Sequence, residues 1–165
     1  MLGAEAPGME TLRPHSTAHH STIQVESRHP TQFIDLTDEL EAFVRTAGVL
    51  TGLVNVQSLH TTAAIVVNEH EPLLLADVTA MLERLVSQET VYRHDIVSLR
   101  GANCVLGERP NGHSHCRALL LAPSACLNVV EGRLRLGRWQ RVFLVELDGP
   151  RTREVSVLLM GGSEL

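Results

Sequence analysis

The feature that most restricts the fold of this chain is an unbroken apolar run of five residues, from Ala63 to Val67. Continuous apolar runs of this kind are typical of strands that are covered on both faces. Polar residues bound the run on each side, with Thr62 before it and Asn68 after it. The fold therefore needs structural layers on both sides of this segment, and we expect the strand to be central.

Two other segments have the apolar spacing of amphipathic helices. The first begins at Thr37, which we expect to cap the helix, and ends at Gly48, a typical stop residue. The second begins at Pro72, which suits the first turn of a helix. The apolar stripes consist of Leu40, Phe43, Val44 and Ala47 in the first helix, and of Leu74, Val78, Met81, Leu82 and Leu85 in the second.

Short alternating or apolar segments, separated by turn signals such as Glu131-Gly132, predict about seven strands. The predicted strands cover residues 22–26, 53–58, 63–68, 126–130, 133–136, 140–147 and 154–160. A polar connection from Val91 to Gly112, long enough to suggest a binding or lid role, leads to a short predicted helix over 114–121. The class is α+β: a compact antiparallel or mixed β-sandwich or barrel-like sheet with two main helices and a short one.

Length and composition favour one globular domain. The chain has 165 residues, and its first twenty lack apolar periodicity. We therefore expect a flexible leader over 1–20 and a single domain over 21–165. Three cysteines without CxxC spacing, and no signal sequence or apolar run of the roughly 18–20 residues that span a bilayer, favour a cytoplasmic protein without a membrane partner.

The charge and the residue types exclude several functions. A net charge of −5 and an aromatic content of 3% argue against nucleic acid as a partner. All fourteen basic residues are arginine, so a lysine Schiff base and a phosphate-binding loop lysine are both excluded. Cys116 follows a histidine, but a small buried thiol is the simpler interpretation of this residue than a nucleophile.

Three of the polar clusters between apolar segments carry histidine. They contain His60, His94 and the pair His113 and His115. Neutral imidazoles that converge from different elements, often with a carboxylate, are the usual ligands of a borderline divalent metal. A histidine at the end of a strand is more often a structural residue held by a hydrogen bond, so the spacing alone leaves both interpretations open.

Arginines gather near the end of the chain. From Glu131 to Arg153 there are six arginines and three acidic residues. Guanidinium groups bind phosphate oxygens through paired hydrogen bonds, so a phosphorylated ligand is one hypothesis. The alternative is that several of these arginines pair with the acidic residues or lie on a solvated face.

These clusters, in this order, resemble the YjbQ-like family, which is often labelled secondary thiamine-phosphate synthase. The resemblance covers about residues 22–162. It rests on the segments 58–65 (SLHTTAAI), 68–69 (NE), Asp77, 94–95 (HD), 111–115 (NGHSH), 132–140 (GRLRLGRWQ) and 148–153 (DGPRTR).

The resemblance implies a compact α+β fold, a homotrimer, and a polar pocket near the subunit boundary. It also implies a divalent metal ion, zinc or magnesium, and a small phosphorylated ligand. Family members carry histidine at the position of His115. The residues that we expect at the site are His60, His94 and His115 as metal ligands; His115, Glu69 and Asp95 as catalytic residues; and Arg151, Arg153, Asn111 and Trp139 as ligand-binding residues.

Two functions from different classes follow from the resemblance. The first is a transferase that joins an aminopyrimidine diphosphate to a thiazole phosphate, in which a metal ion or arginines stabilise the leaving pyrophosphate. The second is a homotrimer that binds a metal and a small ligand without significant catalysis.

Overall fold

The computed structural model describes residues 17–103 and 107–162. In these residues it has eight strands, three α-helices and two short 3₁₀ helices. The strands are β1 (Thr17–Glu26), β2 (Gln32–Asp35), β3 (Thr51–Ser58), β4 (Ala63–Glu69), β5 (Ser124–Val130), β6 (Arg133–Leu134), β7 (Gln140–Glu146) and β8 (Thr152–Gly162). The helices are α1 (Thr37–Ala47), α2 (Pro72–Leu85), η1 (Arg93–Asp95), η2 (Val97–Leu99) and α3 (Gly112–Leu120).

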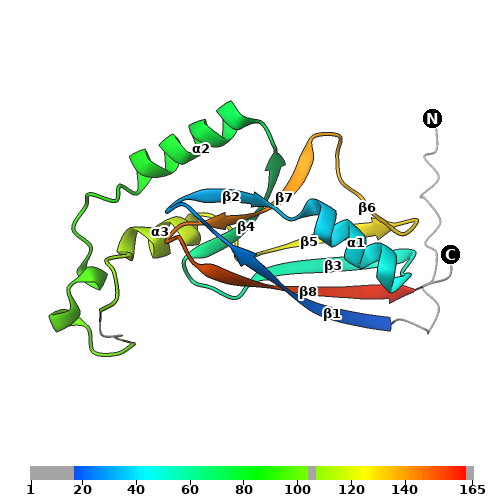
Figure 1. Cartoon of the computed structure of the whole chain (residues 1–165), viewed down its shortest axis with the longest axis horizontal. Coiled ribbons are helices and arrows are strands. Elements are labelled where there is room, and N and C mark those ends of the chain that lie inside the picture. The colour runs from blue at the N-terminus through cyan, green and yellow to red at the C-terminus, as the bar shows by residue number, and fades with distance from the viewer. Residues whose placement is uncertain (1–16, 104–106, 163–165) are drawn as a thin grey trace, which may run out of the picture.

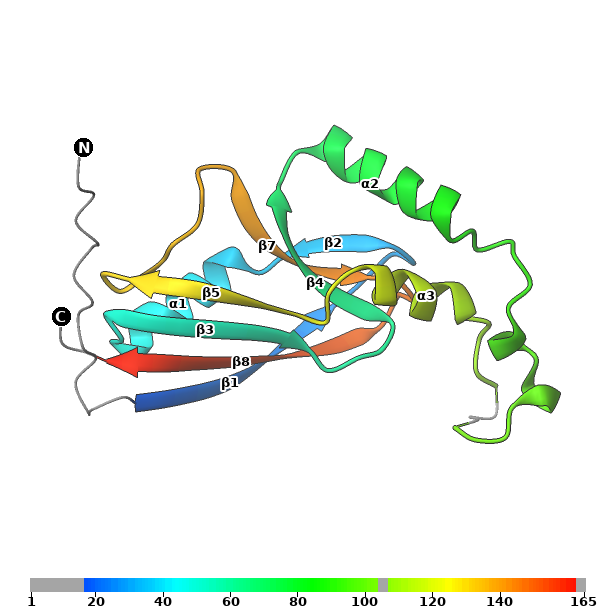
Figure 2. The ribbon, with the colours of Figure 1, turned by 180° about the vertical axis from the view of Figure 1, so that it is seen from behind.

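The strands form two antiparallel sheets. Sheet A has the order β1-β8-β3-β5-β6, and sheet B has the order β2-β7-β4. Sheet B and α1 cover one face of sheet A, whereas α2 and α3 lie on the far side of sheet B (Figures 1 and 2). The α+β prediction, with two longer helices and a short one, is therefore confirmed.

The apolar run is β4, and it lies between two hydrophobic cores. Ala63 and Ile65 face the larger core between the sheets, whereas Ala64 faces the smaller core beneath α2 and α3. The expectation of cover on both faces is thus confirmed. The expectation that the strand is central is wrong, because β7 is the middle strand of sheet B. The free edge of β4 is partly covered, since the Ile65 amide donates to the carbonyl of Ala122.

The predicted helix boundaries hold to within two residues, but one cap differs. Thr37 does not cap α1: its amide donates to Asp35 Oδ1 at 2.9 Å, while its hydroxyl accepts from the Val142 amide at 2.8 Å. The helix ends at Gly48, which is left-handed with φ of 68°. The Glu71 side chain accepts the first free amides of α2. Thr37 therefore ties the helix to sheet B instead of closing its end.

Two segments at the start of the chain differ from prediction. Residues 17–20, placed in the leader by the sequence, belong to β1, where Thr17 pairs with Gly161 of the long strand β8. The rest of the predicted leader, residues 1–16, lies outside the described residues. The sequence missed β2, whose four residues are too few to display a period and which pairs with β7.

The two sheets are joined by a buried ion pair between Glu146 of β7 and Arg153 of β8. The Arg153 Nε lies 2.7 Å from Glu146 Oε2, and both side chains are at most 4% exposed. The Glu146 carboxylate also accepts a hydrogen bond from the Ser27 hydroxyl and from the amides of Leu147 and Asp148. Burial alone would raise the pKa of Glu146, but the hydrogen bonds, above all those from Arg153, lower it.

Replacing Arg153 by methionine should lower the free energy of unfolding by about 3–5 kcal/mol, because Glu146 would stay buried without its counter-charge. The double variant Glu146→Leu/Arg153→Met removes both charges and should lose less stability than Arg153→Met alone. Guanidinium denaturation followed by circular dichroism measures both losses. The single variant Glu146→Leu is measured as well. If the loss of unfolding free energy in the double variant equals the sum of the losses in the two single variants, this account is contradicted.

Candidate functional site

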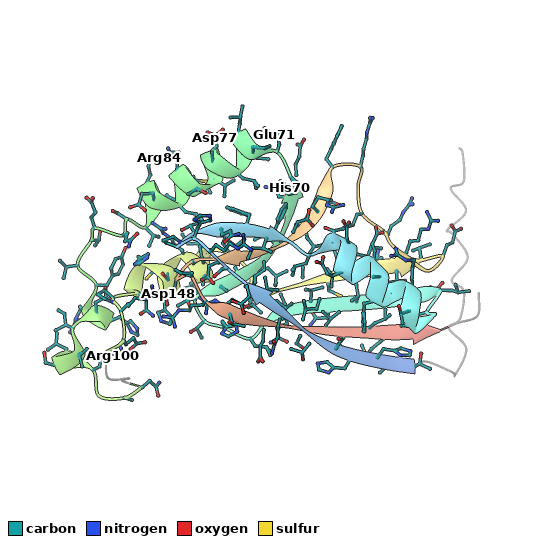
Figure 3. All side chains as sticks on the ribbon, in the orientation of Figure 1. His70, Glu71, Asp77, Arg84, Arg100 and Asp148 are labelled. Carbon is teal, nitrogen blue, oxygen red and sulfur yellow. The ribbon has the colours of Figure 1, made fainter. Side chains whose placement is uncertain are left out.

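Most of the polar residues singled out in the sequence gather at one end of the molecule. Here three segments come together: α3, the turn between β7 and β8, and the connection from α2 to α3, described over residues 86–103 and 107–111 (Figures 1 and 3). Asp148 in the β7–β8 turn and Arg100 in the connection mark the two sides of this end in Figure 3. We call it the histidine–arginine site.

The connection is attached to the start of α3 by close contacts. Asp95 Oδ1 accepts the backbone amides of Asn111 at 2.9 Å and Gly112 at 2.8 Å, two groups that the helix itself leaves free. A Cβ atom on Gly112 would lie 2.5 Å from the Cβ of Tyr92, so only glycine fits there. The carboxylate of Asp95, predicted to be catalytic, is thus used to hold η1 against α3.

This attachment brings two of the three predicted metal ligands together. The rings of His94 and His115 lie edge to face, with centroids 4.6 Å apart. The Nε2 atom of His94 is buried and has no hydrogen-bond partner among the described residues. Burial, and then the neighbouring His94, lower the pKa of His115, so the ring is neutral at pH 7.

A buried carboxylate between two arginines forms the other half of the site. Asp148 is 7% exposed, and its Oδ2 accepts hydrogen bonds from Arg151 at 2.8 Å and from Asn111 Nδ2 at 3.1 Å. Arg109 Nη2 lies 3.8 Å from Asp148 Oδ1 and donates to its carbonyl oxygen. Two guanidinium groups therefore share one carboxylate. The Oδ1 atom of Asn111 is buried without a partner in the described part of the chain.

His113 is buried in the first turn of α3, and its hydrogen bond with Ser114 fixes its tautomer. The Ser114 hydroxyl donates to the Leu147 carbonyl, so it accepts from His113 Nε2–H across 3.1 Å. Burial, and then the charge of Arg117, lower the pKa of His113. The ring is 6% exposed, and it packs beside Tyr92. His113 thus supports the site from within.

The remaining predicted site residues lie elsewhere or make other contacts. His60 Nε2 accepts the backbone amide of Glu154 at 2.8 Å. Arg153 is occupied by Glu146 and by the hydroxyl of Thr62. Glu69 is the last residue of β4 and pairs with Gln140 of β7. Trp139, in the loop before β7, is 61% exposed, and the guanidinium group of Arg138 lies over its ring.

The thiol of Cys116 is exposed, contrary to the expectation of a buried residue, because it lies on the outer face of α3.

Sequence reasoning missed Arg109, and also the pair formed by Arg100 and Glu108. These residues lie in an irregular connection without periodicity. No pattern there indicates which way a side chain points.

Within residues 17–103 and 107–162, no three His, Cys, Asp or Glu side chains are grouped so that they could hold a metal ion. In the same residues, no helix has both the length and the apolar content needed to cross a bilayer.

The fold and the site define a small antiparallel α+β protein with histidines and arginines gathered at one end. The family model described as "UPF0047 protein YjbQ-like" matches residues 21–162. The chain belongs to this family, as the sequence motifs predicted.

Curated relatives and solved structures agree with this assignment. A UPF0047 protein of Archaeoglobus fulgidus is 40% identical over 126 residues, which cover 76% of this chain and 89% of the relative. One from Methanothermobacter thermautotrophicus is 37% identical over 130 residues, covering 79% of this chain and 83% of the relative.

A crystal structure of a "YbjQ-like protein of unknown function" from Sulfolobus solfataricus superposes with a TM-score of 0.80 at 32% identity, covering 89% of this chain and 99% of that one. A hypothetical protein from Aeropyrum pernix gives a TM-score of 0.76 at 34% identity, covering 87% and 98%.

The contact of Gly112 with Tyr92 gives a test of how the site is assembled. Gly112→Ala should displace Tyr92, weaken the cap from Asp95 and separate His94 from His115. We expect a loss of about 1–3 kcal/mol in the free energy of unfolding, with altered ring signals of both histidines in NMR spectra. Gly101→Ala is the matched control, because a Cβ there meets no atom within 4 Å. If the two variants had the same unfolding free energy and the same histidine signals, the proposed assembly would be contradicted.

Stability should fall as the pH drops below about 6.5. The pKa values of His60, His113 and His115 are all lowered in the folded chain. Between the ordinary histidine pKa of about 6.5 and these lowered values, the unfolded chain binds more protons than the folded one, so acid favours unfolding. Denaturation at pH 7.5, 6.5 and 5.5 should show this trend, with a shallower slope for His113→Gln. Equal stability at all three pH values would be inconsistent with it.

Proposed function

We propose that the histidine–arginine site binds a small phosphorylated ligand. The observation that carries this proposal is that two guanidinium groups, Arg109 and Arg151, share the single carboxylate of Asp148, next to two buried polar atoms without partners in the described residues. Guanidinium groups bind phosphate oxygens with charge-assisted hydrogen bonds. Buried polar atoms without partners are rare in folded proteins, and a bound ligand would satisfy them.

A divalent ion, zinc or magnesium, is the second component that we propose. His94 and His115 offer two imidazoles, the ligand type that zinc prefers, and the unpartnered Nε2 of His94 suits an ion. Since these two residues make an incomplete ligand set, water or the phosphorylated ligand would supply the rest. A bound ion would neutralise charge on the phosphate oxygens.

The reaction that we propose is of the thiamine-phosphate synthase type. The bond between the methylene carbon of an aminopyrimidine diphosphate and its pyrophosphate oxygen breaks, and the thiazole nitrogen forms the new bond to that carbon. The electron pair of the broken bond leaves with pyrophosphate, so the site must stabilise growing negative charge. Arg109 and Arg151 meet this need, and the half-buried rings of His94 and His115 would shield the reacting carbon from part of the solvent.

The alternative is a homotrimer that binds the metal and the ligand without significant catalysis. Large apolar side chains exposed on the outer face of sheet A favour an assembly, among them Leu53 at 43% and Met160 at 50% exposure. Asn55 and Ser156, which are uncharged, lie on the same face, and Glu154 of β8 is a charged residue there. A surface of this kind is suited to contact another copy of the chain.

Turnover separates the two functions. The purified protein is incubated with the aminopyrimidine diphosphate, the thiazole phosphate and Mg²⁺ or Zn²⁺, and thiamine phosphate is quantified. We expect product, with at least a hundredfold loss for Arg109→Ala/Arg151→Ala, since both would contact the leaving group. Arg135→Ala, on an exposed loop, is the matched control.

Absence of product from a folded, metal-loaded protein would rule out the synthase. Light scattering that gives the mass of three chains, together with bound metal and phosphate, would then support the binding function. A monomer that binds neither metal nor phosphate would contradict both proposals.

A further inference from the structure

His60 lies apart from His94 and His115, the pair of predicted metal ligands whose rings are in contact. His60 begins the short turn between β3 and β4, at the same end of the molecule as α3 and the β7–β8 turn in both ribbon views (Figures 1 and 2). Arg153 ties this turn to β8 through its hydrogen bond to the hydroxyl of Thr62. The His60 ring is thus held beside the arginines at the start of β8.

One ring nitrogen of His60 is already used. Leu59 still pairs with Glu154, donating its amide to the Glu154 carbonyl at 3.1 Å. The chain then leaves the sheet, and Nε2 of His60 accepts the Glu154 amide at 2.8 Å in place of a backbone carbonyl. A backbone amide can only donate, so Nε2 must be unprotonated, and in the neutral ring the proton is on Nδ1.

The tautomer decides what His60 can bind. A metal ligand needs a free lone pair, and the neutral ring has its only lone pair at Nε2, which is engaged. The Nδ1–H group makes no hydrogen bond to the described residues, and it is not among the buried atoms without partners. It is therefore a donor open to solvent, available to an oxygen atom of a ligand.

Four charged groups act on the His60 ring. Arg153 of β8 and Arg151, directly before β8, lower its pKa, whereas Glu154 of β8 and Glu146 of β7 raise it. Glu146 neutralises Arg153 inside the protein, whereas Arg151 shares its carboxylate partner Asp148 with Arg109. The Nη1 group of Arg151 makes no hydrogen bond to any residue that the structure describes. Arg151 therefore offers a second donor on the same flank of the site.

We infer that His60 is a hydrogen-bond donor to a phosphate group, acting together with Arg151, and is not a metal ligand. The inference rests on the phosphorylated ligand of the proposed function and assigns one flank of that site to its phosphate. Burial, and then the charge of Arg153, lower the pKa of the ring, which keeps it neutral in the tautomer described above.

Two substitutions separate the nitrogens of the ring. In His60→Asn, the side-chain amide can replace the Nδ1–H donor but does not reach Glu154. In His60→Gln, the longer side chain can accept the Glu154 amide and leaves the Nδ1 position empty. The probes are inorganic phosphate and pyrophosphate, titrated by calorimetry, and Zn²⁺ alone, titrated in a separate experiment. Thermal unfolding of each variant checks its fold.

We expect His60→Gln to weaken phosphate binding about tenfold or more while Zn²⁺ binding changes by less than about twofold. His60→Asn should keep phosphate binding within about threefold of the unmodified protein. His115→Ala should show the reverse of His60→Gln, with Zn²⁺ binding lost and phosphate binding kept. None of these measurements uses turnover, so failure of the synthase reaction leaves this test intact.

The ring nitrogens can also be observed directly. Long-range ¹⁵N–¹H NMR spectra of the unmodified protein should show His60 protonated at Nδ1. A proton on Nε2, loss of Zn²⁺ binding in folded His60→Gln, or unchanged phosphate binding in that variant would each overturn the inference. So would an unmodified protein that binds neither phosphate nor pyrophosphate. If His60→Gln does not fold, the NMR spectrum and His60→Asn decide.

Discussion

The buried pair of Glu146 and Arg153 is the interaction on which the rest of the structure depends. A carboxylate and a guanidinium removed from water are tolerated only when almost every donor and acceptor is used. Glu146 meets this condition by binding Ser27, which follows β1, and the amides of Leu147 and Asp148. One carboxylate thus fixes sheet A, sheet B and the turn that carries Asp148.

The histidine–arginine site inherits its geometry from this pair. Because Glu146 holds the amide of Asp148, the Asp148 side chain is fixed where Asn111, Arg109 and Arg151 meet it. The outer residues of the site are then positioned by the protein interior instead of by a flexible loop. Placing donors in advance in this way reduces the cost of ordering them around a ligand.

The sequence predicted the elements better than their contacts. The run from Ala63 to Val67 revealed a strand with a core on each face, because apolar residues on both faces need cover on both. Gly48 revealed the end of α1 because its left-handed conformation favours glycine. The edge position of β4 and the existence of β2 could not be predicted, since strand order depends on pairing between distant segments.

Prediction of the site was limited for the same reason. Of the polar clusters at the ends of apolar elements, those with His94 and His115 meet, whereas Glu69 ends β4 opposite Gln140. The pattern could not tell a carboxylate that faces a ligand from one that caps a helix, as Asp95 does. Nor could it show that Arg153 is occupied within the interior, because six arginines in the same stretch look alike until their partners are known.

The attachment of the connection to α3 has a consequence for how proteins of this kind can diversify. Asp95 fastens one end of the stretch 96–108, and Arg109 fastens the other through the Asp148 carbonyl. Exposed residues between these anchors, such as Val97 and Leu99, can be exchanged without moving the histidines or the shared carboxylate. This stretch borders the site, so new ligand preferences can arise there while the buried framework stays unchanged.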